Sequence, residues 1–278
     1  ELSSHDSWCI SIKLMMGSVV FLGIISAILY RDLNSNVLTN KKYYNPEEVK
    51  VKKKKEKPSL MDSFKTIMTS SELGYIAILI IAYGITINLV EVQWKQQLKL
   101  MFKGDVAGYN SFMGDYSTYT GVFAIFFGLF VGSKILQNFS WMVSALITPV
   151  TILCGGSIFF AFIISKDFLI SLYSSGISSD IMFNPVIVAS FLGASIVISS
   201  KVVKYTLFDP TKEMAYIPLS EELKVKGKAA VDVIGGRAGK SGGSLIQIML
   251  LWVFSGGVTA IAPYVAISFV FFSVIWLI

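Results

Sequence analysis

Residues 73–92, LGYIAILIIAYGITINLVEV, decide the fold class of this chain. They carry one charge, on Glu91, and a helix of about 20 mostly apolar residues crosses about 30 Å of hydrocarbon. None of the chain's apolar runs alternates with the two-residue period of a membrane β-barrel, so helices remain as the spanning structure. The sequence therefore predicts an all-α membrane protein with seven transmembrane helices. The six further runs lie at 8–30, 119–136, 141–164, 181–200, 244–257 and 258–278. The run at 244–257 is short, and we expect its helix to begin earlier.

The composition agrees with a membrane protein. Hydrophobic residues make up 54% of the chain and charged residues 15%, against about 45–50% and about 25% in soluble domains. The two cysteines, Cys9 and Cys154, lie within or beside apolar runs, which does not indicate a disulfide framework. The single histidine, His5, offers no metal site. We expect neither a metal nor a cofactor.

Basic residues predict the orientation. Residues 31–72 hold ten Lys or Arg and residues 201–242 hold eight, out of 24 in the chain. Basic loops stay on the cytoplasmic side, and four predicted spans separate these two segments, so both fall on that side. The first residue then lies outside and residue 278 inside. Because no cleavable signal precedes the first span, we expect the chain to be part of a longer polypeptide.

The lysine-rich stretch 50–57, closed by Pro58, is the clearest linker. A solvated connector is the favoured interpretation. Adhesion to anionic lipid, at about 1 kcal/mol per basic residue, is the alternative. Nucleic-acid binding is not expected, because no folded reading module accompanies the charge. A short amphipathic helix is predicted at 59–71. The expected organisation is a transmembrane helix at 1–30 that ends a first bundle, a basic cytoplasmic linker at 31–72, and a second six-helix bundle at 73–278.

Polar residues share one face of the helix predicted from residue 73 onward. Asn88, Glu91, Lys95 and Lys99 are spaced by three, four and four, which places them on one side. An acid at the bilayer centre costs about 2.5–3.5 kcal/mol on insertion scales, so we favour a face that meets a partner or a watery cavity. The alternative is a local Glu91–Lys95 pair near the outer interface, with Trp94 as an interfacial anchor.

A second candidate site follows Phe208. Pro210 in the sequence FDPTKE predicts a helix end and a restart, with Pro210 in the first turn. Lys212 and Glu213 would then lie at a helix N-terminus, where backbone N–H groups favour anions. Lys212 is a candidate phosphate ligand and Glu213 its orienting partner. A capped cytoplasmic helix with a surface ion pair is the alternative.

The string GGRAGKS at 235–241 is not a P-loop, because the first glycine of that motif is replaced by Ile234. We expect no enzyme activity from it. Glycines at 235, 239 and 243 instead predict a smooth helix face for close packing. Arg237 and Lys240, three residues apart, are candidate phosphate contacts. Anchoring of the helix start on the basic side of the membrane is the alternative.

Several blocks of this sequence resemble the non-mitochondrial ATP/ADP translocases of intracellular bacteria and plastids. These blocks are INLVEVQWKQQLK at 87–99, YNSFMGDYSTYTG at 109–121, FDPTKEMAYIPLSEELKVKGKAAVDVIGG at 208–236 and GKSGGSLIQ at 239–247. The resemblance implies a major-facilitator-like fold of twelve helices in two bundles, of which this chain holds the sixth helix and the second bundle. Glu91 matches an acidic position that the family uses in transport, and Lys212 matches a position in its signature block.

The resemblance also implies a function and its partners. It implies antiport of ATP for ADP, by alternating access, across the bacterial inner membrane. Asn88, Glu91, Lys95, Lys212, Glu213, Arg237 and Lys240 are the candidate substrate contacts. The expected partners are ATP, ADP, the lipid bilayer and an N-terminal bundle of the same protein, without which we expect no transport. The alternatives are transport of another nucleotide, of NAD or of a non-nucleotide solute with proton coupling, or a membrane scaffold that transports nothing.

Overall fold

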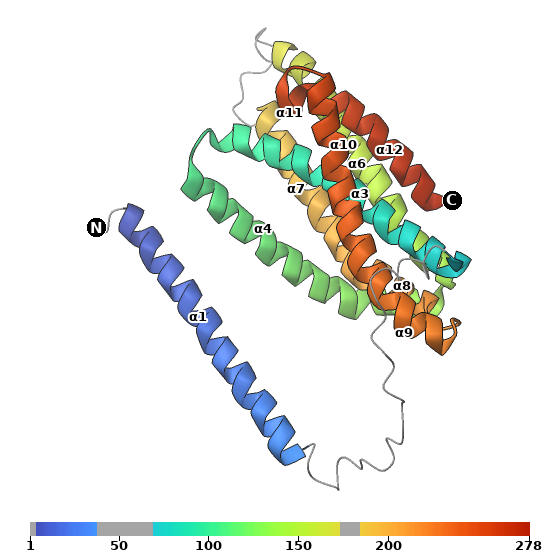
Figure 1. The fold of residues 1–278 in the computed structure, drawn as a ribbon. Coiled ribbons are helices and arrows are strands. Elements are labelled where there is room, and N and C mark those ends of the chain that lie inside the picture. Colours follow the sequence, from blue (N-terminus) through green and yellow to red (C-terminus); the bar gives the residue numbers. More distant parts are fainter. Residues whose placement is uncertain (1–3, 38–68, 173–183) are drawn as a thin grey trace. The chain divides into compact units, whose positions relative to one another are not determined.

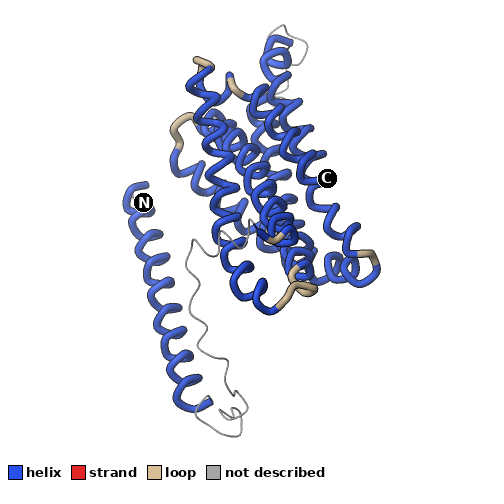
Figure 2. Tube along the Cα trace, turned by 45° about the vertical axis from the view of Figure 1, so that its right-hand side comes forward, coloured by secondary structure: helices blue, strands red, loops and turns tan. Residues whose placement is uncertain are grey.

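The computed structural model describes residues 4–37, 69–172 and 184–278, and the regular elements in these ranges are all helices (Figures 1 and 2). The prediction of an all-α membrane protein is therefore confirmed. By its contacts the chain divides into two units, Glu1–Lys57 and Pro58–Ile278. The predicted domain boundaries stay predictions. Much of the linker at 31–72, and most of the short helix predicted at 59–71, lies outside the described residues.

The first unit consists of one long helix. Helix α1 (Ser4–Asp32) continues into a π-helical turn, η1 (Leu33–Val37). Its apolar side chains, among them Phe21 and Leu22, are exposed. A helix of 29 residues rises about 43 Å at 1.5 Å per residue, which exceeds the hydrocarbon thickness. Residues 8–30 thus form the helix that their composition predicts.

The second unit is a bundle built around one central helix. Helix α3 (Ser71–Phe102) packs against α4, α7, α10 and α12 (Figure 1). Its side chains Leu89, Trp94 and Leu98 are fully buried, as expected of a helix enclosed on most sides. The remaining elements are α4 (Val106–Phe127), η2 (Gly128–Gly132), α5 (Ser133–Asn138), α6 (Trp141–Leu172), α7 (Pro185–Val203), η5 (Lys204–Phe208), α8 (Asp209–Ala215), α9 (Glu221–Ala230), η6 (Val231–Gly235), α10 (Gly236–Val253), α11 (Gly257–Ala260) and α12 (Ala262–Leu277).

Five described helices are long and apolar enough to cross a membrane. They are Cys9–Val37, Ser71–Phe102, Val106–Asn138, Trp141–Lys166 and Pro185–Ala215. The other two predicted spans are shorter helices: α12 has 16 residues and α10 has 18. Helix α10 begins at Gly236, which confirms that the sixth span starts before residue 244.

The glycines of η6 and α10 make the close packing that their spacing predicts. A Cβ atom on Gly84 of α3 would lie 2.8 Å from the Cα atom of Gly239, and one on Gly239 would lie 2.8 Å from the carbonyl oxygen of Ile81. One turn further, a Cβ atom on Gly243 would lie 2.9 Å from Asn88. Helix α10 therefore touches α3 backbone to backbone, as small residues at four-residue spacing allow.

We expect Gly239→Ala to lower the free energy of unfolding by about 1–3 kcal/mol, the usual effect of an added group in a packed contact. The reason is that the nearest atoms are backbone and cannot rotate away. Gly236→Ala is the matched control, since nothing lies within 4 Å of its Cβ position. Thermal unfolding in detergent measures both variants. Equal melting temperatures for the two would contradict the backbone contact.

The helix end predicted at Pro210 is wrong. Phe208 and Asp209 both have α-helical backbone angles, and helical structure runs through α7, η5 and α8. The π-helical turn η5 accommodates the proline: the N–H of Asp209 donates to the carbonyl of Lys204, five residues back. A π-turn shifts the hydrogen-bond register by one residue and so absorbs a disturbance within a helix. Lys212 and Glu213 therefore do not lie at an open helix N-terminus.

Candidate functional site

Asn88, Glu91 and Lys95 lie on one face of α3, because α3 is helical throughout. Asn88 links this face to α10. Its side-chain oxygen accepts hydrogen bonds from the Gln247 amide at 3.2 Å and from the Ser244 hydroxyl at 3.4 Å. We call Asn88, Glu91 and Lys95 the polar seam of α3. The polar seam begins at the α3–α10 contact, one turn along α3 from the contact between Gly84 and Gly239.

Glu91 pairs with a lysine that the sequence reasoning missed. Its carboxylate lies 3.2 Å from the ammonium of Lys201 on α7. The side chains are 21% and 29% exposed respectively, so the pair is enclosed but reachable. The Lys201 ammonium also lies 5.1 Å from the centre of the Tyr116 ring on α4, within the range of a cation–π interaction. Three helices therefore meet at one charge pair.

Both parts of the alternative interpretation of this face are wrong. Glu91 forms its ion pair with Lys201 rather than with Lys95. Trp94 is fully buried and is not an interfacial anchor. Its indole N–H donates to the Ser190 carbonyl of α7 at 2.9 Å, and its ring packs on Tyr116 with 4.8 Å between centroids. The half-buried Lys95 has no ion-pair or hydrogen-bond partner for its ammonium among the described residues.

Lys212 and Glu213 form a second cluster, between α8 and the η6–α9 segment. The Lys212 ammonium lies 3.0 Å from Asp232 and 3.4 Å from Glu213, and its side chain is 14% exposed. Glu213 also pairs with Lys228. Burial, reinforced by the Asp232 carboxylate, raises the pKa of the Tyr216 phenol above its ordinary value. The protonated hydroxyl therefore donates to Asp232, at 3.4 Å. The Lys212 ammonium is therefore already paired with two carboxylates, those of Asp232 and Glu213.

We expect Lys212 and Asp232 to be energetically coupled. A double-mutant cycle of Lys212→Gln and Asp232→Asn should give an interaction free energy of about 0.5–3 kcal/mol, as for residues in one charge network. The reason is that Lys212→Gln leaves Asp232 without its cation, and Asp232→Asn leaves Lys212 with Glu213 as its remaining carboxylate. Melting temperatures and denaturant midpoints of the four proteins supply the measurement. Strictly additive changes would show that the 3.0 Å contact is not populated.

Arg237 and Lys240 are exposed on α10. Neither side chain has a carboxylate, hydrogen-bond or aromatic partner among the described residues. Lys204 of η5 differs from them, because it pairs with Asp209 on the same helical segment at 2.7 Å. The structure thus separates the candidate cations into two classes. Lys201, Lys204 and Lys212 have carboxylate partners, whereas Lys95, Arg237 and Lys240 have none in the described part of the chain.

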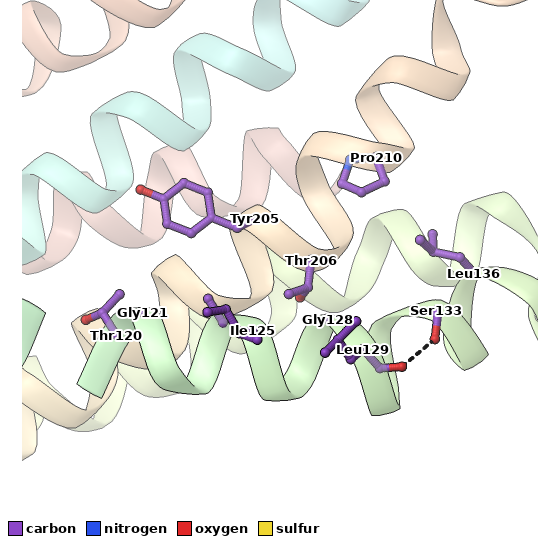
Figure 3. A pocket seen from close by; sticks show the side chains of 11 residues that line it. Thr120, Gly121, Ile125, Gly128, Leu129, Ser133, Leu136, Tyr205, Thr206 and Pro210 are labelled. Atoms are coloured by element: carbon purple, nitrogen blue, oxygen red, sulfur yellow. Dashed lines mark hydrogen bonds between the residues drawn. The ribbon is translucent and has the colours of Figure 1, made fainter. Parts of the chain in front are cut away.

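One well-formed cavity is not part of this polar seam. It has a volume of about 690 Å³ and lies between the α4–η2 segment and the η5–α8 segment. Figure 3 shows Thr120, Ile125 and Leu129 on one side, facing Tyr205 and Pro210. None of the predicted site residues lines it. Its mostly apolar wall has no cation for a phosphate. Within the described residues, no group of three His, Cys, Asp or Glu side chains is placed to hold a metal ion.

The comparison with known proteins identifies the family. A family model described as TLC ATP/ADP transporter matches residues 2–278. The chain belongs to this family. TLC membership and the apolar helices together make it a multi-pass membrane protein of a transporter family. No solved structure matches the chain.

TLC relatives are similar over almost the whole chain. ADP,ATP carrier protein 1 of Chlamydia pneumoniae is 45% identical over 275 residues, which are 98% of this chain and 52% of that protein. ADP,ATP carrier protein 1 of Rickettsia bellii is 46% identical over 261 residues, 93% of this chain and 51% of the relative. The chloroplastic ADP,ATP carrier protein 1 of Arabidopsis thaliana is 40% identical over 274 residues, 98% of this chain and 41% of the relative. The chain therefore spans about half the length of the bacterial relatives.

Proposed function

We propose that this chain forms the second bundle of a carrier that exchanges ATP for ADP across a bacterial inner membrane. The observation that carries the proposal is the polar seam on α3. It holds an enclosed acid–base pair, Glu91–Lys201. On the same helix lies Lys95, which has no partner among the described residues. Helix α10, packed on α3, adds Arg237 and Lys240, likewise without partners in the described part of the chain. Cations without carboxylate partners are suited to bind a polyphosphate. The printed names of the relatives, ADP,ATP carriers, support the choice of nucleotide.

The proposed cycle uses two bundles around one site. The bacterial relatives are about twice as long as this chain, so we assign the opposite wall of the site to a first bundle. In a major-facilitator-like arrangement, rocking of the bundles exposes the site to each side in turn. Exchange of ATP⁴⁻ for ADP³⁻ moves one net charge, worth about 2.3 kcal/mol per 100 mV. The membrane potential would therefore bias the direction of exchange.

Each candidate residue has a part in this proposal. Lys95, Arg237 and Lys240 contact the phosphates, and Asn88 holds the seam to α10 through its bonds to Ser244 and Gln247. Glu91 balances the charge of the empty site. Lys212 and Glu213 lie in the second cluster, where Asp232 must release Lys212 before it can contact a phosphate. Their part is therefore later in the cycle, when this cluster opens.

The test is nucleotide uptake by a bacterial host that expresses the complete gene encoding this chain. We expect uptake of labelled ATP, competition by unlabelled ADP, and release of preloaded label only when ATP or ADP is added outside. AMP, NAD and a protonophore are the comparison conditions. Uptake that needs a proton gradient but no counter-nucleotide would favour the symport alternative. A correctly inserted protein that takes up no nucleotide would favour another solute or a scaffold.

A further inference from the structure

The contribution of the Glu91–Lys201 pair to the stability of the fold does not explain why it is present. Removing two charges from water is costly, and apolar replacements of enclosed ion pairs are often neutral or stabilising. Both side chains remain partly exposed, so an anion can reach the ammonium. The two partners come from different helices, α3 and α7. The pair can therefore separate without unfolding either helix.

Lys201 is held in position by a chain of contacts that returns to its own helix. The ammonium lies over the Tyr116 ring, Tyr116 packs on Trp94, and the Trp94 indole bonds to the Ser190 carbonyl of α7. Gly193 leaves the room for this indole, because a Cβ atom there would lie 2.4 Å from Trp94 Cδ1. The contacts fix α3, α4 and α7 around one ammonium group.

The Tyr116 hydroxyl is the group in this arrangement whose hydrogen bonding is not satisfied within the described residues. It is buried, and it has no hydrogen-bond partner in the described part of the chain. A buried hydroxyl without a partner is unfavourable, because it has lost its hydrogen bonds to water. An oxygen acceptor bound at Lys201 would lie near the Tyr116 ring that supports the ammonium. Among the described residues, the Lys201 ammonium is thus paired with Glu91 and lies beside a buried phenol that has no hydrogen-bond partner.

We propose that Lys201 is a phosphate ligand of the substrate, that Glu91 occupies it when the carrier is empty, and that Tyr116 and Trp94 are its positioning residues. The proposal rests on the proposed function. It adds that the substrate phosphate and the Glu91 carboxylate compete for the Lys201 ammonium. A phosphate oxygen and the Glu91 carboxylate accept from the same ammonium, so one displaces the other. Glu91 is then a built-in counter-ion that keeps an empty site neutral.

The other paired lysines are less suited to this exchange. Lys204 bonds to Asp209, five residues away on the same continuous helical segment, at 2.7 Å. Lys212 is 14% exposed and lies between two carboxylates. Lys204 also lies over aromatic rings, those of Tyr83 and Tyr205. What distinguishes Lys201 among these three is that its one carboxylate partner within the described residues comes from another helix.

Nucleotide affinity of the purified complete carrier in nanodiscs tests the proposal, with ATP as the probe. We expect Lys201→Gln to weaken ATP binding about tenfold or more, the effect of losing one hydrogen bond to a charged group. Glu91→Gln should tighten ATP binding severalfold, because the competitor is gone. Glu91→Gln combined with Lys201→Gln should bind as weakly as Lys201→Gln alone. Lys134→Gln is the matched control, an exposed lysine on α5.

The roles of Tyr116 and Trp94 in positioning Lys201 are tested by separate measurements. Tyr116→Phe should retain more affinity than Tyr116→Leu, because it keeps the aromatic ring beneath the ammonium. A variant in which Trp94 is the single tryptophan should change its emission when ATP binds. Lys201→Arg keeps the charge and serves if Lys201→Gln does not fold. The KM of Lys201→Arg for ATP should exceed that of the wild type, because the guanidinium places its donors differently from an ammonium; an unchanged KM would count against Lys201 as a phosphate ligand.

The outcomes separate this inference from the proposed function. If the wild-type carrier neither binds nor exchanges ATP, both fail. If the wild type exchanges ATP for ADP and Lys201→Gln leaves the KM unchanged, the inference alone fails. If Glu91→Gln weakens ATP binding as much as Lys201→Gln does, Glu91 orients Lys201 instead of competing for it, and the competition is overturned.

Discussion

Trp94→Ala is expected to lower the free energy of unfolding by about 3–5 kcal/mol, the range for removing a large aromatic side chain from a packed core. Trp94 is 0% exposed. Its removal leaves a void beside Tyr116 and Gly193 and deprives the Ser190 carbonyl of its donor. Trp94→Phe should recover part of the loss, since it keeps an aromatic ring but not the N–H donor.

Trp252→Ala is the matched control for this prediction. Trp252 is the same residue type on α10, and it is 86% exposed. Exposed substitutions usually change stability by at most about 0.5 kcal/mol, so its melting temperature should stay close to wild type. Thermal unfolding of the detergent-solubilised chain, followed by circular dichroism, measures all variants. Equal losses for Trp94→Ala and Trp252→Ala would contradict the buried, three-helix position of Trp94.

The fold class could be predicted because membrane spanning depends on local composition. A run such as 73–92 must be a helix in lipid whatever surrounds it. The effect of Pro210 could not be predicted in the same way. Whether a proline ends a helix depends on how neighbouring groups compensate for it. Here the π-turn η5 reassigns the Asp209 donor, and the Thr211 hydroxyl donates to the Leu207 carbonyl at 2.7 Å. These adjustments depend on backbone geometry that the residue sequence FDPT does not show.

The candidate site was predictable only as far as helix periodicity reaches. Spacing alone placed Asn88, Glu91 and Lys95 on one face of α3. The partner of Glu91 is more than a hundred positions away, on α7, and only tertiary packing brings it close. Lys201 had one visible signal, a charge directly after the apolar run 181–200. That charge counted only toward membrane orientation, so its role in an ion pair was missed.

The same limit explains which cations remain without partners. The candidate cations in the second bundle look alike in sequence, since each lies outside the apolar runs as one basic residue among several. Tertiary packing brings Asp232 to Lys212 and Glu91 to Lys201. It places no carboxylate beside Arg237 or Lys240 in the described part of the chain. For a polyphosphate ligand this difference matters, because a paired ammonium such as that of Lys201 must first lose its partner.

The second large effect is therefore expected at Arg237 and Lys240. The double variant Arg237→Gln with Lys240→Gln, in the complete gene, should reduce ATP uptake at low ATP concentration at least a hundredfold. Each charged hydrogen bond contributes about 1.5–3 kcal/mol, and every 1.4 kcal/mol is about a factor of ten in affinity. Neither substitution removes an ion pair within the described residues, so the melting temperature should change little.

Initial rates of labelled ATP uptake at several ATP concentrations provide the measurement, with the amount of inserted protein determined in parallel. If these cations bind phosphate in both the ground state and the transition state, the loss appears mainly as a raised KM. Lys103→Gln with Lys134→Gln removes two exposed lysines from α3's end and from α5, and it should transport like wild type. A double variant at Arg237 and Lys240 with unchanged KM and rate would show that these cations only anchor α10, and the phosphate site would then have to be sought at Lys95 and Lys201.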